Sequence, residues 1–427
     1  MKAIGIDIGT TGISGVLLDG ESGALLRAIT KNSNAFLESA AFYERIQSVD
    51  KILSVADGIL EELLEDGVGV IGVTGQMHGI VYLDEKGSAL SPLYTWQDGR
   101  GDLPYKDTTY AAYLGCATGY GNVTDFYNRE NGIRPASAVT YATIHDYYVM
   151  HLCGLCEPLL HDSDAASFGL YNAQTKSFDY DYHPQVVNGF CLAGKHKGIP
   201  VTVAIGDNQA SVLSTAKEGD ILVNVGTGSQ VSLISSIPAN AEGIESRPFF
   251  EGKHLLVGSA LCGGRAYSVL KDFYKAVASC FKENVSDGEV YAAMDKMIAE
   301  KPASPLRVDT RFAGTRTDPS VRGSIENVST ENLTPSALAH GVLCGMASEL
   351  YGLYEKMGVR ATSLVGSGNG IRKNAPLVAL CEEMFGAKMK TPVHLEEAAF
   401  GAALYALVSA GVYPTLEEAQ RLIRYQE

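Results

Sequence analysis

Residues 4–11 read IGIDIGTT, and residues 221–228 read ILVNVGTG. Each stretch is an apolar run that ends in Asp or Asn, one further apolar residue and a Gly-Thr pair. An apolar run before a glycine-rich turn predicts a buried strand, and the apolar residues that follow predict a second strand. Because the two stretches lie about half a chain apart, the repeat predicts a duplicated strand–turn–strand unit in two similar domains.

The remaining pattern mixes strands and helices, which indicates an α/β protein. Residues 48–66 have apolar side chains at helical spacing with Ser48 as N-cap, and 68–75 is typical of a buried strand. Further helices are expected at 137–152, 265–280, 335–357, 374–385, 397–410 and 415–425. Further strands are expected at 200–205, 221–225, 230–235, 254–258 and 362–366. The short polar stretch 216–220 divides an expected domain of residues 1–215 from one of residues 216–427.

The composition excludes several classes of partner. The chain has 427 residues, a formal net charge of −15 and 46% hydrophobic residues, which is typical of a globular protein. This acidic balance argues against binding to nucleic acid or to an anionic membrane surface. No apolar run approaches the ~18 residues of a membrane span, and no signal peptide is visible. With eight scattered cysteines, typical of reduced thiols, we expect a cytoplasmic protein.

The two Gly-Thr turns carry chemistry suited to phosphate. Small residues let the backbone approach the phosphates, while turn amides and threonine hydroxyls donate hydrogen bonds to their oxygens. Asp7 precedes the first turn, where its carboxylate could hold Mg²⁺. Taken alone, the same residues are also explained by a tight hairpin with a capping acid.

Two further segments follow apolar strands. LVGSGNGIRKN (364–374) has the strand–turn–helix context of a nucleotide site, but its G-x-G-x-G spacing differs from the dinucleotide fingerprint, so a dehydrogenase is disfavoured. VAIGDNQAS (203–211) places Asp207 at a helix start. That carboxylate is explained by an N-cap, or by a base that accepts a proton from an attacking hydroxyl.

Polar residues and the single tryptophan suggest a site for a polyol. TGQMHG (74–79) puts Gln76 and His78 after a buried strand, and YTWQDGR (94–100) contains Trp96. Polar groups that each recognise one hydroxyl, beside an indole for an apolar face, are what a sugar requires. A tight turn over a packed indole is the other explanation of YTWQDGR.

Taken together, and in their order along the chain, these segments resemble the FGGY family of carbohydrate kinases, within the actin, Hsp70 and hexokinase superfamily. The resemblance covers nearly the whole chain: GIDIGTT (5–11), VTGQMHG (73–79), TWQDGR (95–100), IGDNQAS (205–211), VNVGTGSQ (223–230), FAGTRTDPSVRG (312–323), GSGNG (366–370) and EEAAFGAALYA (396–406). The pair TGQMHG and TWQDGR is most similar to the sedoheptulokinase branch. The xylulokinase branch usually carries Asn at the position of Gln97.

The resemblance implies two ribonuclease-H-like domains that close over a cleft, and an enzyme that uses ATP and Mg²⁺ to phosphorylate the terminal hydroxyl of a ketose. By motif, Asp207 corresponds to the catalytic base, and Asp7 with Asp207 to the acids associated with Mg²⁺. The ATP-binding positions are Thr10, Thr11, Gly226, Thr227, Gly228, Gly366, Gly368 and Asn369. The sugar-binding positions are Gln76, Met77, His78, Trp96, Asp98, Arg100 and Asn208.

The chain departs from the family pattern after the first turn. GTTGISGVLL (9–18) lacks the Lys or Arg that family members usually place there. Arg265, Arg316 or Lys373 could replace that cation, and the sequence does not choose among them. Three alternatives stay open. The first is a kinase for xylulose, ribulose, gluconate or another polyol, and the second is a sugar-binding sensor with weakened catalysis, which the missing base suggests. The third is an ATPase without a sugar, against which QMHG and TWQDGR count. The resemblance also leaves a homodimer open.

Overall fold

The computed structural model describes residues 1–180, 184–299, 302, 304–316, 318 and 320–426. Of the segment 312–323 quoted above, residues 317 and 319 lie outside this set. The chain forms two compact units. Unit 1 comprises 1–215, 248–252 and 394–424, and unit 2 comprises 216–247, 253–393 and 425–427.

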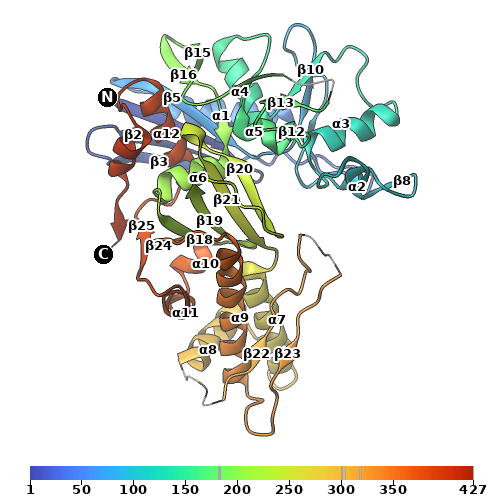
Figure 1. Cartoon of the computed structure of the whole chain (residues 1–427), viewed down its shortest axis with the longest axis vertical. Helices are drawn as coiled ribbons and strands as arrows, with labels where there is room; N and C mark the ends of the chain where they lie inside the picture. The colour runs from blue at the N-terminus through green and yellow to red at the C-terminus, as the bar shows by residue number, and fades with distance from the viewer. Residues whose placement is uncertain (181–183, 300–301, 303, 317, 319, 427) are drawn as a thin grey trace. The chain divides into compact units, whose positions relative to one another are not determined.

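The sheet of unit 1 is built around the first predicted hairpin (Figure 1). Its strands are ordered β15 (Leu192–His196), β16 (Ile199–Thr202), β5 (Val68–Gly75), β1 (Lys2–Ile8), β2 (Gly12–Asp19) and β3 (Leu25–Asn32), with β17 (Ile205–Gly206) also paired to β5. β1 is antiparallel to β2 and parallel to β5. The carboxyl ends of β1 and β5 therefore lie side by side, next to the first Gly-Thr turn.

Helices cover both faces of this sheet. Side chains of successive strand residues point to opposite faces. On one face Ile6 packs in a core with α1 (Val49–Leu63) and α4 (Ile144–Cys153). On the other face α12 (Glu397–Ser409) lies against β1 and β5 and beside α6 (Asp207–Thr215).

Glycines explain how closely α12 approaches the sheet. A Cβ on Gly5 would lie 1.9 Å from the carbonyl oxygen of Ala399, and one on Gly72 would lie 2.0 Å from that of Ala402. Only glycine leaves room for helix backbone at these distances. Residues 394–424 consequently belong to unit 1, whereas the sequence led us to expect all of 216–427 in one domain.

Unit 2 repeats the strand arrangement of unit 1. Its sheet is ordered β20 (Ile244–Pro248), β21 (His254–Ala260), β19 (Ser229–Ser235), β18 (Asp220–Val225), β24 (Ser363–Ser367), β25 (Met389–Pro392) and β26 (Tyr425–Gln426). β18 is antiparallel to β19 and parallel to β24, as β1 is to β2 and β5. This confirms the predicted α/β class and the duplicated hairpin.

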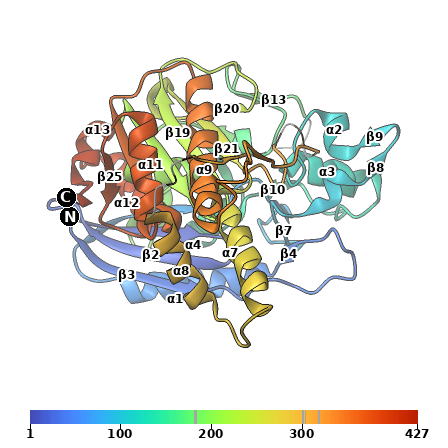
Figure 2. The ribbon, with the colours of Figure 1, turned by 90° about the horizontal axis from the view of Figure 1, so that it is seen from below.

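The longer helices of unit 2 are α7 (Gly263–Ser279), α8 (Asp287–Ala299), α9 (Pro335–Lys356) and α11 (Ala375–Phe385) (Figure 2). The short helix α10 (Asn369–Arg372) follows β24. A core of buried apolar side chains joins the strands to α7, α8, α9 and α11. No helix in the described part of the chain combines the length and apolar character that crossing a bilayer requires.

Shorter elements fill the connections. In unit 1 the strands are β4 (Ile46–Gln47), β6 (Val81–Leu83), β7 (Leu93–Tyr94), β8 (Pro104–Tyr105), β9 (Thr108–Thr109), β10 (Thr140–Ala142), β11 (Leu159–His161), β12 (Tyr171–Asn172), β13 (Ser177–Phe178) and β14 (Gln185–Val187). The helices there are η1 (Gly99–Asp102), α2 (Tyr110–Leu114), α3 (Gly121–Glu130), α5 (Asp162–Ser167), η2 (Phe250–Gly252), α13 (Leu416–Ala419) and η3 (Gln420–Leu422). Unit 2 adds β22 (Arg307–Val308) and β23 (Ile325–Glu326).

Two predicted helices are shorter than expected. The stretch 137–152 contains β10 before α4, because Thr143 caps α4 by accepting a hydrogen bond from the backbone N–H of Asp146. The stretch 415–425 forms only α13 and η3 before β26. Ser48, by contrast, caps α1 as predicted, accepting from the N–H of Lys51.

Candidate active site

Asp7 lies at the carboxyl end of β1, opposite Ser14 on β2 and Thr74 on β5. Its Oδ1 atom is buried and has no hydrogen-bond partner among the described residues. Burial, followed by the charges of Asp207 and Glu396, raises the pKa of Asp7 to about 8. A carboxylate with an orphaned oxygen, near two further acids, is a donor set that suits Mg²⁺.

Asp207 is the first residue of α6 and follows β17 directly. The N–H of Gly206 donates to Oγ of Ser163 at 3.1 Å, which holds the backbone just before Asp207. Asn208 donates from Nδ2 to Oδ1 of Asp207 at 3.2 Å. Since the charge of Asp207 acts on Asp7, the structure brings the predicted base and the predicted metal-associated acid together within unit 1.

A buried group that the sequence did not reveal lies near Asp207. His145 Nε2 is 3.1 Å from Oδ1 of Asp164, and both side chains are fully buried. Burial, then the charge of Asp207, raises the pKa of Asp164 well above its usual range. Burial lowers the pKa of His145, so both groups favour their neutral forms. The sequence feature that could have indicated this buried polar pair is the polar run HDSDA (161–165), which contains Asp164.

The indole of Trp96 is joined to the first Gly-Thr turn. Its Nε1 donates to Oγ1 of Thr10 at 2.9 Å, while 45% of the residue stays exposed. Thr10 also lies 3.3 Å from Oε1 of Gln76. Gln47, which the sequence did not single out, accepts from Gln76 at 2.9 Å and donates to the carbonyl oxygen of Thr10 at 2.6 Å. The tryptophan is therefore neither a core residue nor an isolated surface residue.

His78 is held in one orientation by its surroundings. Its φ is 74°, a conformation that costs energy for a residue other than glycine. Nδ1 lies 2.8 Å from the carbonyl oxygen of Ser167, and the imidazole stacks on Tyr120 with ring centroids 4.5 Å apart. Since a carbonyl oxygen only accepts, Nδ1 carries the proton. Strain of this kind clusters at ligand sites.

Met77 connects the same loop to the residue after the base. Its side chain is 3% exposed, and its sulfur lies 3.8 Å from Nδ2 of Asn208. The structure therefore brings Met77, Asn208 and Asp207 together at the carboxyl ends of β5 and β17.

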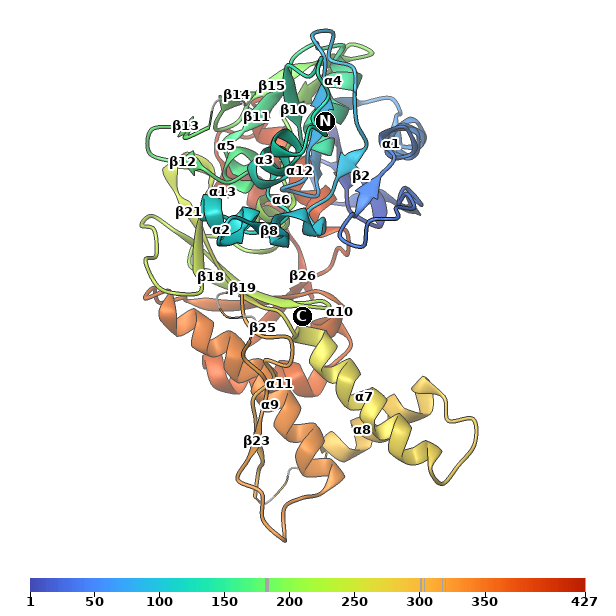
Figure 3. The ribbon, with the colours of Figure 1, turned by 90° about the vertical axis from the view of Figure 1, so that its right-hand side faces the viewer.

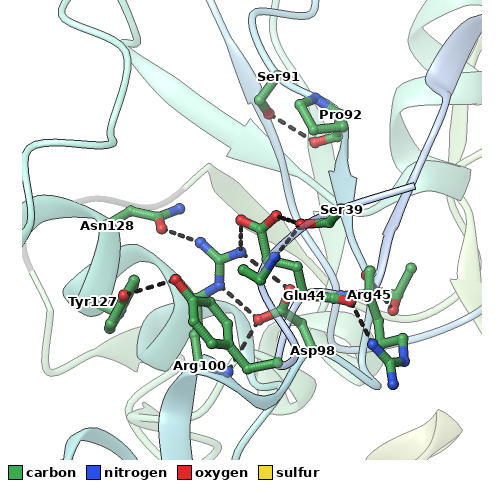
Figure 4. A network of polar contacts seen from close by, with 12 residues as sticks. Ser39, Glu44, Arg45, Ser91, Pro92, Asp98, Arg100, Tyr127 and Asn128 are labelled. Atoms are coloured by element: carbon green, nitrogen blue, oxygen red, sulfur yellow. Dashed lines mark hydrogen bonds and ion pairs between the residues drawn. The ribbon is translucent and has the colours of Figure 1, made fainter. Parts of the chain in front are cut away.

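Asp98 and Arg100 are placed differently from the other predicted sugar-binding residues. Both side chains are fully buried, and the guanidinium binds the carboxylate through Nε at 2.6 Å and Nη2 at 3.1 Å (Figure 4). Arg100 also donates to Asn128 and lies over the ring of Tyr94, 4.3 Å from its centroid. The pair faces inward and fastens the loop that presents Trp96.

In unit 2 the second Gly-Thr turn is docked on the start of α7. The N–H of Gly264 donates to the carbonyl oxygen of Gly226 at 3.0 Å, and that of Arg265 donates to Thr227 at 2.9 Å. A Cβ on Gly263 would lie 2.4 Å from the backbone of Gly228. The helix start therefore holds the shape of the turn.

The third glycine-rich segment lies beside the same turn. Asn224 on β18 donates to Oγ of Ser367 on β24 at 2.6 Å. Gly368 has a φ of 81°, and a Cβ there would lie 2.6 Å from the carbonyl oxygen of Val225. Gly366, Gly368 and Asn369 thus lie together with the second turn at one end of the unit 2 sheet.

Comparisons with known proteins agree with these observations. The models for the N-terminal and C-terminal domains of the FGGY family of carbohydrate kinases match residues 2–104 and 217–410. The chain belongs to the FGGY family of carbohydrate kinases.

Individual relatives refine this assignment. Human sedoheptulokinase is 30% identical, covering 95% of this chain and 97% of that protein, and mouse sedoheptulokinase is 29% identical with the same coverage. The solved structure of a xylulose kinase from Rhodospirillum rubrum superposes with a TM-score of 0.85 at 18% identity, covering 100% of this chain and 93% of that one. This FGGY protein is therefore a sugar kinase with the two-sheet fold of its family.

In this FGGY kinase, the three basic residues that could replace the missing cation have different surroundings. Nη1 of Arg316 is 2.7 Å from Oε1 of Glu245 and is already paired. Lys373 follows the last residue of α10, one turn beyond Asn369. Arg265 alone has its backbone bonded to the second turn. Its side chain is exposed, and among the described residues it has no ion pair.

Burial of His161 in this kinase makes the stability of unit 1 pH-dependent. Burial lowers the pKa of His161 to about 4 despite Asp162 at 3.2 Å. The unfolded chain then binds more protons than the folded one, so stability is present above pH ~6.5 and is lost as the pH falls toward 4. This loss amounts to about 3 kcal/mol.

We expect His161→Asn, which stays neutral and can still cap α5, to lose less stability than the wild type as the pH falls. The urea midpoint at pH 7 and pH 4.5 measures the effect. His151→Asn, at a half-exposed position in the same unit, is the control. An equal pH dependence in wild type and His161→Asn would contradict the expectation.

Proposed function

We propose that this kinase transfers the γ-phosphoryl group of ATP to the terminal hydroxyl of sedoheptulose, giving sedoheptulose 7-phosphate. The observation that supports this substrate most directly is the similarity to two sedoheptulokinases over 95% of the chain. The loops that carry Gln76, Met77, His78 and Trp96 supply hydrogen-bonding groups beside an aromatic face, which suits a polyol.

In this proposal unit 1 binds and activates the acceptor. The apolar face of the sugar packs on Trp96, and Gln76, His78 and Asn208 recognise hydroxyls. Asp207 accepts the proton of the terminal hydroxyl as its oxygen attacks phosphorus. In this proposal the buried Asp98–Arg100 pair supports the loop that carries Trp96.

The nucleotide is bound by the glycine-rich turns. Amides and hydroxyls of Thr10, Thr11 and residues 226–228 donate to phosphate oxygens, and Gly366, Gly368 and Asn369 lie near the adenosine. Asp7 and Asp207 would hold Mg²⁺, which neutralises phosphate charge when bound. Each residue acts by positioning and by electrostatics, which account for most of phosphoryl-transfer catalysis.

Other substrates and a sensor function remain separate candidates. Xylulose kinase from Staphylococcus epidermidis is 24% identical over 97% of this chain, which keeps xylulose, ribulose, gluconate and other polyols under test. A sensor with weakened catalysis is favoured by one observation, the absence of a basic residue in GTTGISGVLL (9–18).

A panel of sugars tests the proposal. We expect ADP release in a coupled assay to be fastest, by kcat/KM, with sedoheptulose and slower with xylulose, ribulose and gluconate. Trp96 provides an independent measure of binding because it is the only tryptophan and is 45% exposed. A bound sugar that excludes water from the indole should shift its emission to shorter wavelength in a saturable manner.

Each other result rejects a defined part of the proposal. Saturable emission changes without ADP indicate the sensor, and ADP without sugar indicates an ATPase. A higher kcat/KM for another polyol replaces sedoheptulose as substrate. Trp96→Phe, which retains a ring but lacks indole emission, is the control for the spectral signal.

A further inference from the structure

Gln47 lies in a closed ring of hydrogen bonds with Thr10 and Gln76. Its side chain is fully buried, its Nε2 donates to the carbonyl oxygen of Thr10 at 2.6 Å, and its Oε1 accepts from Nε2 of Gln76 at 2.9 Å. The ring closes between Oγ1 of Thr10 and Oε1 of Gln76 at 3.3 Å. Trp96 joins the ring from outside, because its Nε1 donates to the same hydroxyl at 2.9 Å. The ring therefore connects the proposed phosphate turn with the proposed sugar-binding loops.

The backbone holds these four residues together within unit 1. The N–H of Gln76 donates to the carbonyl oxygen of Ile8, the last residue of β1, at 2.9 Å. Gln47 is the last residue of β4, which pairs with β7 just before the loop that carries Trp96. The helix that follows Gln47, α1, packs against β2, the strand that follows Thr10 (Figure 3). Each of these contacts joins segments that are distant in the sequence, so the ring forms only in the folded unit.

The direction of every bond in the ring is fixed by a group that can only accept. A carbonyl oxygen has no proton, so the atom of Gln47 that faces Thr10 is its NH₂ group. The other polar atom of Gln47 is then an acceptor, and Gln76 must face it with its own NH₂ group. This leaves the oxygen of Gln76 toward Thr10, whose hydroxyl must donate to it. The indole N–H of Trp96 only donates, so it occupies a lone pair of the hydroxyl and leaves the single proton to Gln76.

We propose that Gln47 is a positioning residue that directs the hydroxyl proton of Thr10 to Gln76 until a sugar binds. The role rests on the proposed function, in which Gln76 binds a sugar hydroxyl and the first Gly-Thr turn binds phosphate. A phosphate oxygen is charged and accepts a stronger hydrogen bond than the amide oxygen at 3.3 Å, which is long for an O–H···O bond. When the proton turns to phosphate, however, Oε1 of Gln76 loses this partner, and Gln76 is only 3% exposed. The loss of a partner by a buried acceptor opposes the change.

A sugar hydroxyl removes this opposition. If it donates to Oε1 of Gln76, the proton of Thr10 can turn to a phosphate without leaving the buried acceptor unpaired. Sugar and ATP therefore strengthen each other's binding, and by linkage the factor is the same in both directions. Couplings of this kind change affinity by about 5- to 150-fold, and for one exchanged hydrogen bond we expect about 10-fold.

Calorimetric titration with Mg²⁺ and the non-hydrolysable ATP analogue AMP-PNP, with and without saturating sugar, measures this coupling. The sugar is sedoheptulose, or whichever polyol has the highest kcat/KM in the coupled assay. The wild type should bind AMP-PNP about 10-fold more tightly with sugar present. Thr10→Val should bind it weakly in both conditions, whereas Thr10→Ser, which keeps the hydroxyl, should retain the difference. Thr11→Val, the matched control in the same turn, should weaken both titrations equally.

Gln47→Met tests the direction of the ring, with an effect of the opposite sign. Methionine is similar in size to glutamine but has no N–H donor and only a weak acceptor, so the amide of Gln76 can turn its NH₂ group toward Thr10. The hydroxyl proton is then available to phosphate without a sugar. We expect this variant, with no sugar present, to bind AMP-PNP about 10-fold more tightly than the wild type. Gln174→Met, the same change at an exposed glutamine of unit 1, should behave as wild type.

The possible results distinguish a failure of this role from a failure of the proposed function. If an active sugar leaves the AMP-PNP affinity of the wild type unchanged, or if its full effect survives in Thr10→Val, the coupling is overturned while the kinase reaction stands. Sugar-free binding by Gln47→Met that equals or falls below that of the wild type overturns the role of Gln47. Because this last comparison needs no sugar, it decides the role even if every sugar of the panel fails to bind.

Discussion

Asp207→Asn should lower sugar-dependent ADP release by about 10³-fold or more, because a positioned general base contributes about 10²–10⁴-fold. The amide nearly matches the carboxylate in size but cannot accept the proton of the attacking hydroxyl. The Oδ1 atom of an asparagine at this position can still accept from Nδ2 of Asn208. Sugar binding measured by Trp96 emission should persist.

The control for this variant is Asp50→Asn. Asp50 is also an aspartate in the first turn of a helix of unit 1, but it is exposed on α1. We expect its turnover to match that of the wild type. Turnover of Asp207→Asn within about 10-fold of wild type would remove Asp207 from the role of general base.

Arg265→Ala should weaken ATP binding and reduce kcat, with a combined fall in kcat/KM for ATP of about 10²-fold. The N–H of Arg265 donates to the carbonyl oxygen of Thr227, so this side chain is attached beside the second Gly-Thr turn. It is the basic group that we propose to replace the cation absent after the first turn. Its charge already acts on neighbouring Cys262, whose pKa burial raises and Arg265 lowers.

Two matched variants make this experiment specific. Arg316→Ala removes an arginine that is bound to Glu245, and Lys373→Ala removes an exposed lysine at the far end of α10. Both should retain turnover close to wild type. Arg265→Lys should recover part of the loss because it restores the charge without the planar guanidinium. If Arg316→Ala or Lys373→Ala shows the larger defect, the cation comes from that residue instead.

The apolar periodicity and the turn residues of the sequence were sufficient to predict several elements of the fold. The two hairpins, the parallel strands after them and the helices α1, α7, α9 and α11 were all predicted, because apolar periodicity and turn residues act over short distances. The attachment of α12 to unit 1 was not predicted. The sequence contains glycines inside β1 and β5, which indicate that another backbone segment packs closely there, but they do not identify that segment as α12.

The residues around the candidate site also divide into those that local motifs identify and those that distant partners position. Motifs marked Asp7, Asp207 and His78, and the structure brings the first two together. The inward orientation of Asp98 and Arg100 depends on distant partners such as Asn128, which no local pattern reveals. Gln47 and His145 were missed for the same reason, since each acts through residues far away in the sequence.

The position of α12 has a consequence for how the protein is made. The faces of Gly5 and Gly72 that α12 covers belong to strands that leave the ribosome before unit 2, whereas α12 is translated after nearly all of unit 2. Domains usually fold in order as they emerge. Here unit 1 must wait, with one side of its sheet uncovered, until nearly all of unit 2 has been synthesised. Completion of unit 1 therefore depends on a segment that is made only after the sheet of unit 2 is nearly complete.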